Sequence, residues 1–121
     1  MKTVLVIEDN EDNMVLISRL LEKSQYRVLQ AGNGQKGIDA AIEHRPDFII
    51  LDIQLPDMDG TEVLRSLREK DMTSGIPVIA MTSFAMSGDR ERLLASGCNG
   101  YIEKPIDPGI VIEQIKKIIK E

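Results

Sequence analysis

The sequence is poor in the residues that mark several classes of protein. Its 121 residues include one cysteine, Cys98, one histidine, His44, and no tryptophan. A single cysteine cannot form a disulfide within the chain, and a lone histidine with no cysteine at ligand spacing argues against a zinc site. We therefore expect Cys98 to be a small buried side chain and His44 to lie near the C-terminal end of a helix.

Long hydrophobic runs and an excess of positive charge are also missing. No apolar stretch approaches the ~20 residues of a membrane-spanning helix, and no signal-peptide pattern follows Met1 and Lys2. The 15 lysines and arginines are outnumbered by 20 aspartates and glutamates, and the net charge of −5 repels a phosphate backbone. We expect a cytoplasmic protein that binds neither membranes nor nucleic acid.

What the sequence does contain is a regular alternation of strand and helix patterns. The predicted strands are residues 3–7, 26–30, 48–51, 77–81 and 101–103. Between and after them, helical spacing predicts helices from Asn10 to about Lys23, around 38–42, around 63–67, over 90–96 and from Pro108 onward. Residues 83–89 are expected to be a loop or a ragged start of the helix over 90–96. Strict alternation indicates βαβ units, so the predicted class is α/β with a doubly wound, five-stranded parallel sheet. Residues 1–121 are expected to form one domain.

Four of the predicted strands end at polar residues: Glu8 and Asp9, Asp52, Thr82 and Lys104. Because the carboxyl ends of parallel strands meet at one edge of a sheet, these side chains are expected to converge there. Three carboxylates repel one another, so either their pKa values rise or a cation binds between them. Mg²⁺ fits best, since Asp9 and Asp52 with one backbone carbonyl would suffice and Glu8 could act through water.

Each of these residues also has a purely structural explanation. Asp52 could cap backbone at a strand end, Thr82 could satisfy nearby backbone, and Lys104 could be an exposed charge. The pair Glu8 and Asp9 could be the acidic start of a helix. The combination favours a site, and a cis bond before Pro105 is one way to aim the lysine inward.

Four motifs in this order resemble the receiver domain of two-component response regulators. They are Glu8-Asp9-Asn10, Asp52 within FIILDIQLPDMDG, Thr82-Ser83, and Tyr101-Ile102-Glu103-Lys104-Pro105. The resemblance covers the whole chain and is closest to single-domain regulators of the CheY and DivK type and to receiver modules of hybrid histidine kinases. It implies a flavodoxin-like (βα)5 fold with strand order 2-1-3-4-5 and no output domain.

The resemblance also implies roles for the polar residues. Asp52 would be the phosphoacceptor, taking a phosphoryl group from the phosphohistidine of a histidine kinase or histidine phosphotransfer protein. Mg²⁺ or Mn²⁺ would bind Asp9, Asp52 and the carbonyl of Gln54, with Glu8 indirect. Lys104 and Thr82 would bind the phosphoryl oxygens.

A switch is implied as well. Thr82 would move toward the phosphoryl group and Tyr101 would rotate inward, changing the surface of helix four, strand five and helix five for a downstream protein target. Such a bacterial phosphorelay protein phosphorylates and slowly dephosphorylates itself without being a turnover enzyme. It would be a monomer or a weak, phosphorylation-dependent dimer.

The resemblance also implies that two positions that vary among receivers, here Gln54 and Phe84, would affect how fast water attacks the acyl phosphate. We hypothesise that the apolar Phe84 screens the phosphoryl group and prolongs its lifetime, so that Phe84→Glu would accelerate dephosphorylation. The apolar stretch 84–86 could also contact a partner or simply pack under helix four.

Three alternatives share parts of this pattern. A flavodoxin-like redox protein would need a phosphate-cradling loop where Glu8-Asp9-Asn10 stands. An acid-phosphatase-like enzyme would want a second carboxylate two residues after the nucleophile, where Gln54 stands. A degenerate receiver, acting as a phosphorylation-independent interaction module, would not need the complete set of polar residues.

Overall fold

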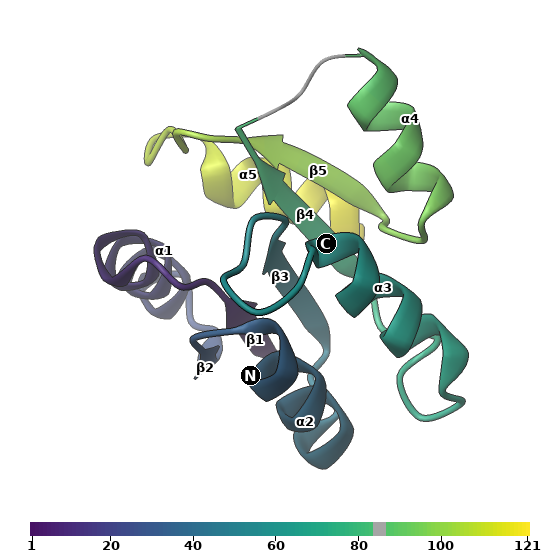
Figure 1. Ribbon diagram of the computed structural model, residues 1–121. Coiled ribbons are helices and arrows are strands. Elements are labelled where there is room, and N and C mark those ends of the chain that lie inside the picture. The colour runs from purple at the N-terminus through teal and green to yellow at the C-terminus, as the bar shows by residue number, and fades with distance from the viewer. Residues whose placement is uncertain (84–86) are drawn as a thin grey trace.

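Five parallel strands form one sheet with helices on both faces in the computed structural model of the protein (Figure 1). The structure describes residues 1–83 and 87–121. The strand order is β2-β1-β3-β4-β5, as the resemblance implied. The elements along the chain are β1 (Thr3–Ile7), α1 (Glu11–Lys23), β2 (Arg27–Ala31), α2 (Gly34–His44), β3 (Phe48–Asp52), α3 (Gly60–Glu69), β4 (Val78–Thr82), α4 (Ser87–Ala95), β5 (Gly100–Glu103) and α5 (Val111–Ile119).

The sheet separates two hydrophobic cores. Successive side chains of a strand point to opposite faces, so Val4 and Val6 of β1 pack on one side and Leu5 and Ile7 on the other. The first core contains α1 and α5, and the second contains α2, α3 and α4. Strands covered on both faces must be apolar throughout, which explains the continuous hydrophobic runs of the sequence.

Among the helices whose preceding residue the structure describes, α1, α2 and α3 begin at a capping side chain. Asn10 Oδ1 accepts the N–H of Asn13 at 2.9 Å, and Asn33 Oδ1 accepts the N–H of Lys36 at 2.9 Å. Asp59 Oδ1 accepts the N–H of Thr61 at 2.9 Å at the start of α3. These caps satisfy backbone donors that a helix leaves unpaired and fix the helix starts near the carboxyl ends of the strands.

Element boundaries differ from the prediction by one to three residues. β2 begins at Arg27 because the N–H of Tyr26 still bonds to the carbonyl of Leu21 at the end of α1. β3 and β4 each extend one residue further, so Asp52 and Thr82 are the last residues of their strands.

The last two helices also begin elsewhere than predicted. α4 begins at Ser87, before the predicted start at residue 90, where the weak apolar periodicity located the start poorly. α5 begins at Val111 and not at Pro108, because Asp107 holds a turn there. Its side chain accepts the N–H of Gly109 at 2.8 Å, and its carbonyl accepts the N–H of Val111 at 2.9 Å.

Two minor predictions are confirmed. Cys98 is 7% exposed and packs in the core of α2, α3 and α4, and His44 is the last residue of α2. Within residues 1–83 and 87–121, every helix is too short or too polar to cross a membrane.

Candidate functional site

Three carboxylates meet at the carboxyl edge of the sheet. Glu8 and Asp9 follow β1, and Asp52 ends β3, the parallel neighbour of β1. One carboxylate oxygen from each residue lies within 4.8 Å of the others. Glu8 and Asp52 are each only 5% exposed, whereas Asp9 is open to solvent. The structure thus confirms that these predicted residues gather.

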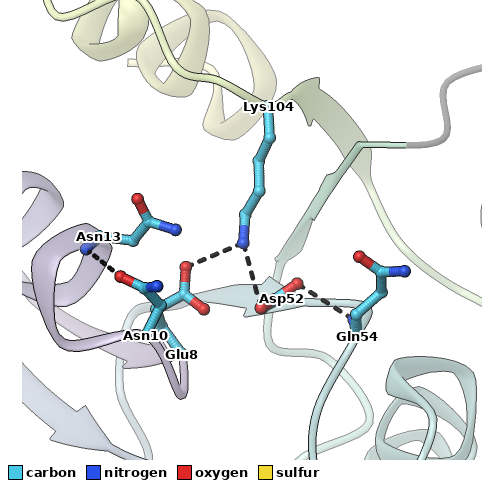
Figure 2. Close-up of polar contacts among 6 residues, drawn as sticks. All are labelled: Glu8, Asn10, Asn13, Asp52, Gln54 and Lys104. Atoms are coloured by element: carbon cyan, nitrogen blue, oxygen red, sulfur yellow. Dashed lines mark hydrogen bonds and ion pairs between the residues drawn. The ribbon is translucent and has the colours of Figure 1, made fainter.

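Lys104 reaches the same place from β5. Its N–H donates to the carbonyl of Thr82 at 2.9 Å, which continues the pairing of β4 with β5 beyond the strand end. Its ammonium Nζ lies 2.9 Å from Glu8 Oε1 and 3.1 Å from Asp52 Oδ2 (Figure 2). The bond from Lys104 to Pro105 is cis. One ammonium therefore bridges two buried carboxylates.

The loop after β3 holds the second oxygen of Asp52. The backbone N–H of Gln54 donates to Asp52 Oδ1 at 3.0 Å. Gln54 itself is exposed to solvent. The loop closes where Gly60 N–H meets the carbonyl of Ile53 at 2.8 Å. A Cβ on Gly60 would lie 2.6 Å from Ile53 Cα, so this close approach requires glycine.

Asp57 ties that loop to α2. Its carboxylate accepts the N–H of Gly34 at 2.8 Å and that of Gln35 at 2.9 Å, both in the first turn of α2. These backbone bonds lower the pKa of Asp57 below its ordinary value. The loop that carries Gln54 is thereby anchored from a second helix.

The site carries more negative charge than its lysine balances. Burial, followed by the neighbouring Asp52, raises the pKa of Glu8 to about 7, and Lys104 only partly opposes this. Burial alone would lower the pKa of Lys104, but its bonds to Glu8 and Asp52 raise it. Glu8 Oε2 is buried without a hydrogen-bond partner among the described residues. Clustered oxygens with an unsatisfied buried acceptor fit a hard divalent cation.

A cavity of about 300 Å³ opens beside Asp52 and Lys104. Its lining includes Ser83 and Pro105 of the motifs named above. It also includes Asn13, Leu16 and Ile106, which the sequence did not single out, because nothing in the pattern shows which side chains of α1 and of the loop after β5 face the acceptor. Asn13 lies four residues after Asp9, and that spacing is the one signal that could have drawn attention to it.

Of the two predicted switch residues, Thr82 lies at the same edge of the sheet and Tyr101 lies beside it in β5. Thr82 is 2% exposed at the end of β4. Tyr101 is half-buried against the core of α2, α3 and α4, and the guanidinium carbon of Arg90 in α4 lies 4.8 Å from its ring centroid. Phe84, and with it the stretch 84–86, lies outside the described residues.

Comparison with known proteins gives consistent matches. The family model described as "Response regulator receiver domain" matches residues 4–116. The polar-differentiation response regulator DivK of Brucella anthropi is 48% identical over 118 residues, covering 98% of this chain and 96% of that protein. The DivK protein of Brucella ovis is 46% identical with the same coverage.

Solved structures match over nearly the whole chain. The receiver domain of a sensor histidine kinase from Pseudomonas aeruginosa, with a magnesium ion coordinated in its active-site cleft, has a TM-score of 0.89 and 32% identity. The alignment covers 99% of this chain and 98% of that one. A chemotaxis response regulator of Vibrio cholerae has a TM-score of 0.93 at 24% identity, covering 98% of both chains, and supports the fold alone.

Proposed function

Because the chain belongs to the response regulator receiver domain family, we propose that Asp52 accepts a phosphoryl group from a phosphohistidine and that this switches a protein-binding surface. The observation that carries the proposal is the placement of Asp52. It is a buried carboxylate at the end of the central strand β3, and it contacts Lys104 and the backbone of Gln54.

The contacts of Asp52 suit a nucleophile. The N–H of Gln54 holds Oδ1 and the ammonium of Lys104 holds Oδ2, so the carboxylate plane is fixed before a donor arrives. One carboxylate oxygen attacks phosphorus in line, the bond from phosphorus to the donor nitrogen breaks, and the electron pair stays on the imidazole. The product is an acyl phosphate on Asp52, whose added charge Lys104 offsets.

A divalent cation completes the proposed site. Asp9, Asp52 and the carbonyl of Gln54 would hold Mg²⁺ or Mn²⁺, and Glu8 would act through water. The close carboxylate oxygens and the unpartnered Glu8 Oε2 support this assignment, as does the magnesium in the Pseudomonas aeruginosa receiver. When bound, the cation neutralises charge on the transferring phosphoryl oxygens.

The switch proposal rests on Thr82 and Tyr101. Thr82 ends β4, the strand next to β3, and its neighbour Met81 pairs with Asp52. We therefore expect its hydroxyl to reach a phosphoryl group on Asp52 after a small movement. Tyr101 packs under Arg90, so a rotation of its ring would change how α4 sits against β5. The proposed output surface comprises α4, β5 and α5.

The proposed partners follow from this chemistry. A histidine kinase or histidine phosphotransfer protein delivers the phosphoryl group, and a downstream protein reads the changed surface. We place the protein in the bacterial cytoplasm, as a monomer or weak phosphorylation-dependent dimer. It dephosphorylates itself slowly and is not a turnover enzyme. The alternative, a phosphorylation-independent interaction module, leaves the assembled carboxylates and lysine without a role.

The first prediction tests this function directly. Incubation with Mg²⁺ and acetyl phosphate is expected to add one phosphoryl group to the wild type, measured by intact mass. Asp52→Ala should abolish the gain, because the acceptor oxygen is removed. Asp47→Asn is the matched control, since Asp47 precedes the same strand at its opposite end. No mass gain in the wild type, or an equal gain in Asp52→Ala, contradicts the proposal and favours the interaction module.

A further inference from the structure

The cavity beside Asp52 combines three charged residues with mostly apolar walls. The charged residues are Glu8, Asp52 and Lys104, which contact one another through the ammonium. α1 supplies Leu16, the loop after β5 supplies Pro105 and Ile106, and buried apolar residues of the strands complete the lining. Apart from the charged residues, the only polar side chains among the described lining residues are those of Asn13 and Ser83. An apolar cleft with few polar groups selects ligands by where those groups lie.

The backbone N–H of Asn13 is hydrogen-bonded, whereas its side-chain amide is available to a ligand. Its N–H donates to the capping side chain of Asn10 at 2.9 Å, which fixes the first turn of α1. Its amide makes no hydrogen bond to another described residue. Figure 2 shows this amide on the side of the site where Glu8 and Lys104 meet, directed away from α1. A donor and an acceptor are therefore presented to whatever enters the cavity.

Because Asp52 lines this cavity, we expect an in-line transfer to place the leaving group there. Asp52 attacks phosphorus from one side, so the leaving nitrogen lies on the opposite side of the phosphoryl group. We expect the ring that carries that nitrogen to lie between Leu16 of α1 and Pro105, which both line the cavity. A phosphorylated imidazole has a second nitrogen. In the protonated form of the donor this nitrogen carries a proton, which allows the ring to leave as neutral imidazole.

We propose that Asn13 is a specificity residue that recognises this second nitrogen: its amide oxygen accepts the ring N–H, while Leu16 and Pro105 cover the ring. This rests on the proposed function, in which the donor is a phosphohistidine. As the phosphorus–nitrogen bond breaks, its electron pair stays on the departing nitrogen and the proton stays on the other. A donor without a ring N–H, such as acetyl phosphate, gains nothing from this contact.

Two small donors of different chemistry test the inference. Phosphorylation rates with monophosphoimidazole and with acetyl phosphate are measured in Mg²⁺ by quenched intact mass, for the wild type, Asn13→Ala and Asp12→Ala. Asp12 lies on the same helical turn but does not line the cavity. Loss of one neutral hydrogen bond is expected to lower the monophosphoimidazole rate of Asn13→Ala by about fivefold. The acetyl phosphate rate, and both rates of Asp12→Ala, should stay within about twofold of the wild type.

The ratio of the two rates is informative because a general loss of folding or of cation binding lowers both rates together. An unchanged ratio in Asn13→Ala therefore overturns the inference. If the ratio of the two phosphorylation rates is unchanged but the acyl phosphate decays at a different rate, Asn13 acts in hydrolysis and the inference is also overturned. A wild type that neither donor phosphorylates refutes the proposed function itself, whereas wild-type phosphorylation with an unchanged ratio refutes only the role of Asn13.

Discussion

Two partly buried cations lie at opposite ends of the sheet, and they are balanced in different ways. Lys104 at the carboxyl edge faces the carboxylates of Glu8 and Asp52. Arg68 at the amino ends of β4 and β5 has no carboxylate partner among the described residues. Its guanidinium donates to the carbonyl of Gly97 at 3.0 and 2.9 Å and to that of Ile76 at 2.8 Å. It also reaches the carbonyls of Thr73 and Ser74 and the side chain of Asn99.

The two ends differ in how their hydrogen-bonding groups and charges are satisfied. Neutral oxygens satisfy the hydrogen-bond donors of Arg68, so this residue joins the loops before β4 and before β5 through hydrogen bonds alone. At the other end, one ammonium faces three acids and an oxygen of Glu8 remains unpartnered. Surplus like charge destabilises the empty site and is relieved by a ligand of opposite charge.

The largest effect on stability is expected at the Arg68 end. Arg68→Ala leaves several partly buried carbonyls without donors and should lower the free energy of unfolding by about 3 kcal/mol. Arg65→Ala, on the exposed side of the same helix, should change it by less than about 0.5 kcal/mol. Urea unfolding followed by circular dichroism measures both. Equal effects of the two substitutions would show that the carbonyl network adds no stability.

At the carboxyl edge of the sheet, Glu8 is expected to make the free energy of unfolding depend on pH. The folded pKa of Glu8 is raised from 4.5 to about 7, so the unfolded chain loses this proton first as pH rises. Without divalent cations, stability should therefore fall between about pH 4.5 and 7, by on the order of 3 kcal/mol, and then level off. Glu8→Gln, which keeps the shape without the charge, should flatten this part of the profile. A wild-type slope that persists in Glu8→Gln would assign it to other groups.

The smallest expected effect is stabilisation by Mg²⁺, and variants at the two ends of the sheet should differ in it. Mg²⁺ at ten times its dissociation constant should stabilise the wild type by about 1.4 kcal/mol, measured as a shift in the unfolding midpoint. Asp9→Asn should lose most of this gain. Arg68→Ala should retain it despite lower stability, because Arg68 lies at the far end of the sheet. If Arg68→Ala abolishes the response to Mg²⁺, the two ends are coupled and our separation of them is wrong.

Most of the fold could be predicted from local patterns. The continuous apolar runs of β1 and β3 indicated strands covered on both faces, and their alternation with helices indicated a parallel sheet. Boundaries were less accurate where a long-range contact decides them. The turn held by Asp107 delays α5, and pairing with Met81 extends β3 to Asp52. The strand order came from the resemblance to a family.

The site could be predicted only as a set of residues. Strand polarity is a consequence of sequence order, so it brought Glu8, Asp9, Asp52 and Lys104 to one edge before any coordinate was known. Asn13 and Arg68 were not singled out. An asparagine or arginine on an amphipathic helix has the same local pattern whether it faces solvent, a cavity or a set of carbonyls.

The sequence by itself thus determined which chemical groups share the carboxyl edge, because hydrophobic periodicity and the direction of parallel strands are properties of the chain. Only the tertiary structure decided how they are paired. Lys104 contacts Glu8 and Asp52, Glu8 Oε2 is left without a described partner, and Asn13 lines the cavity above them. Those outcomes depend on loop paths and side-chain packing between segments far apart in the sequence, which no local pattern encodes.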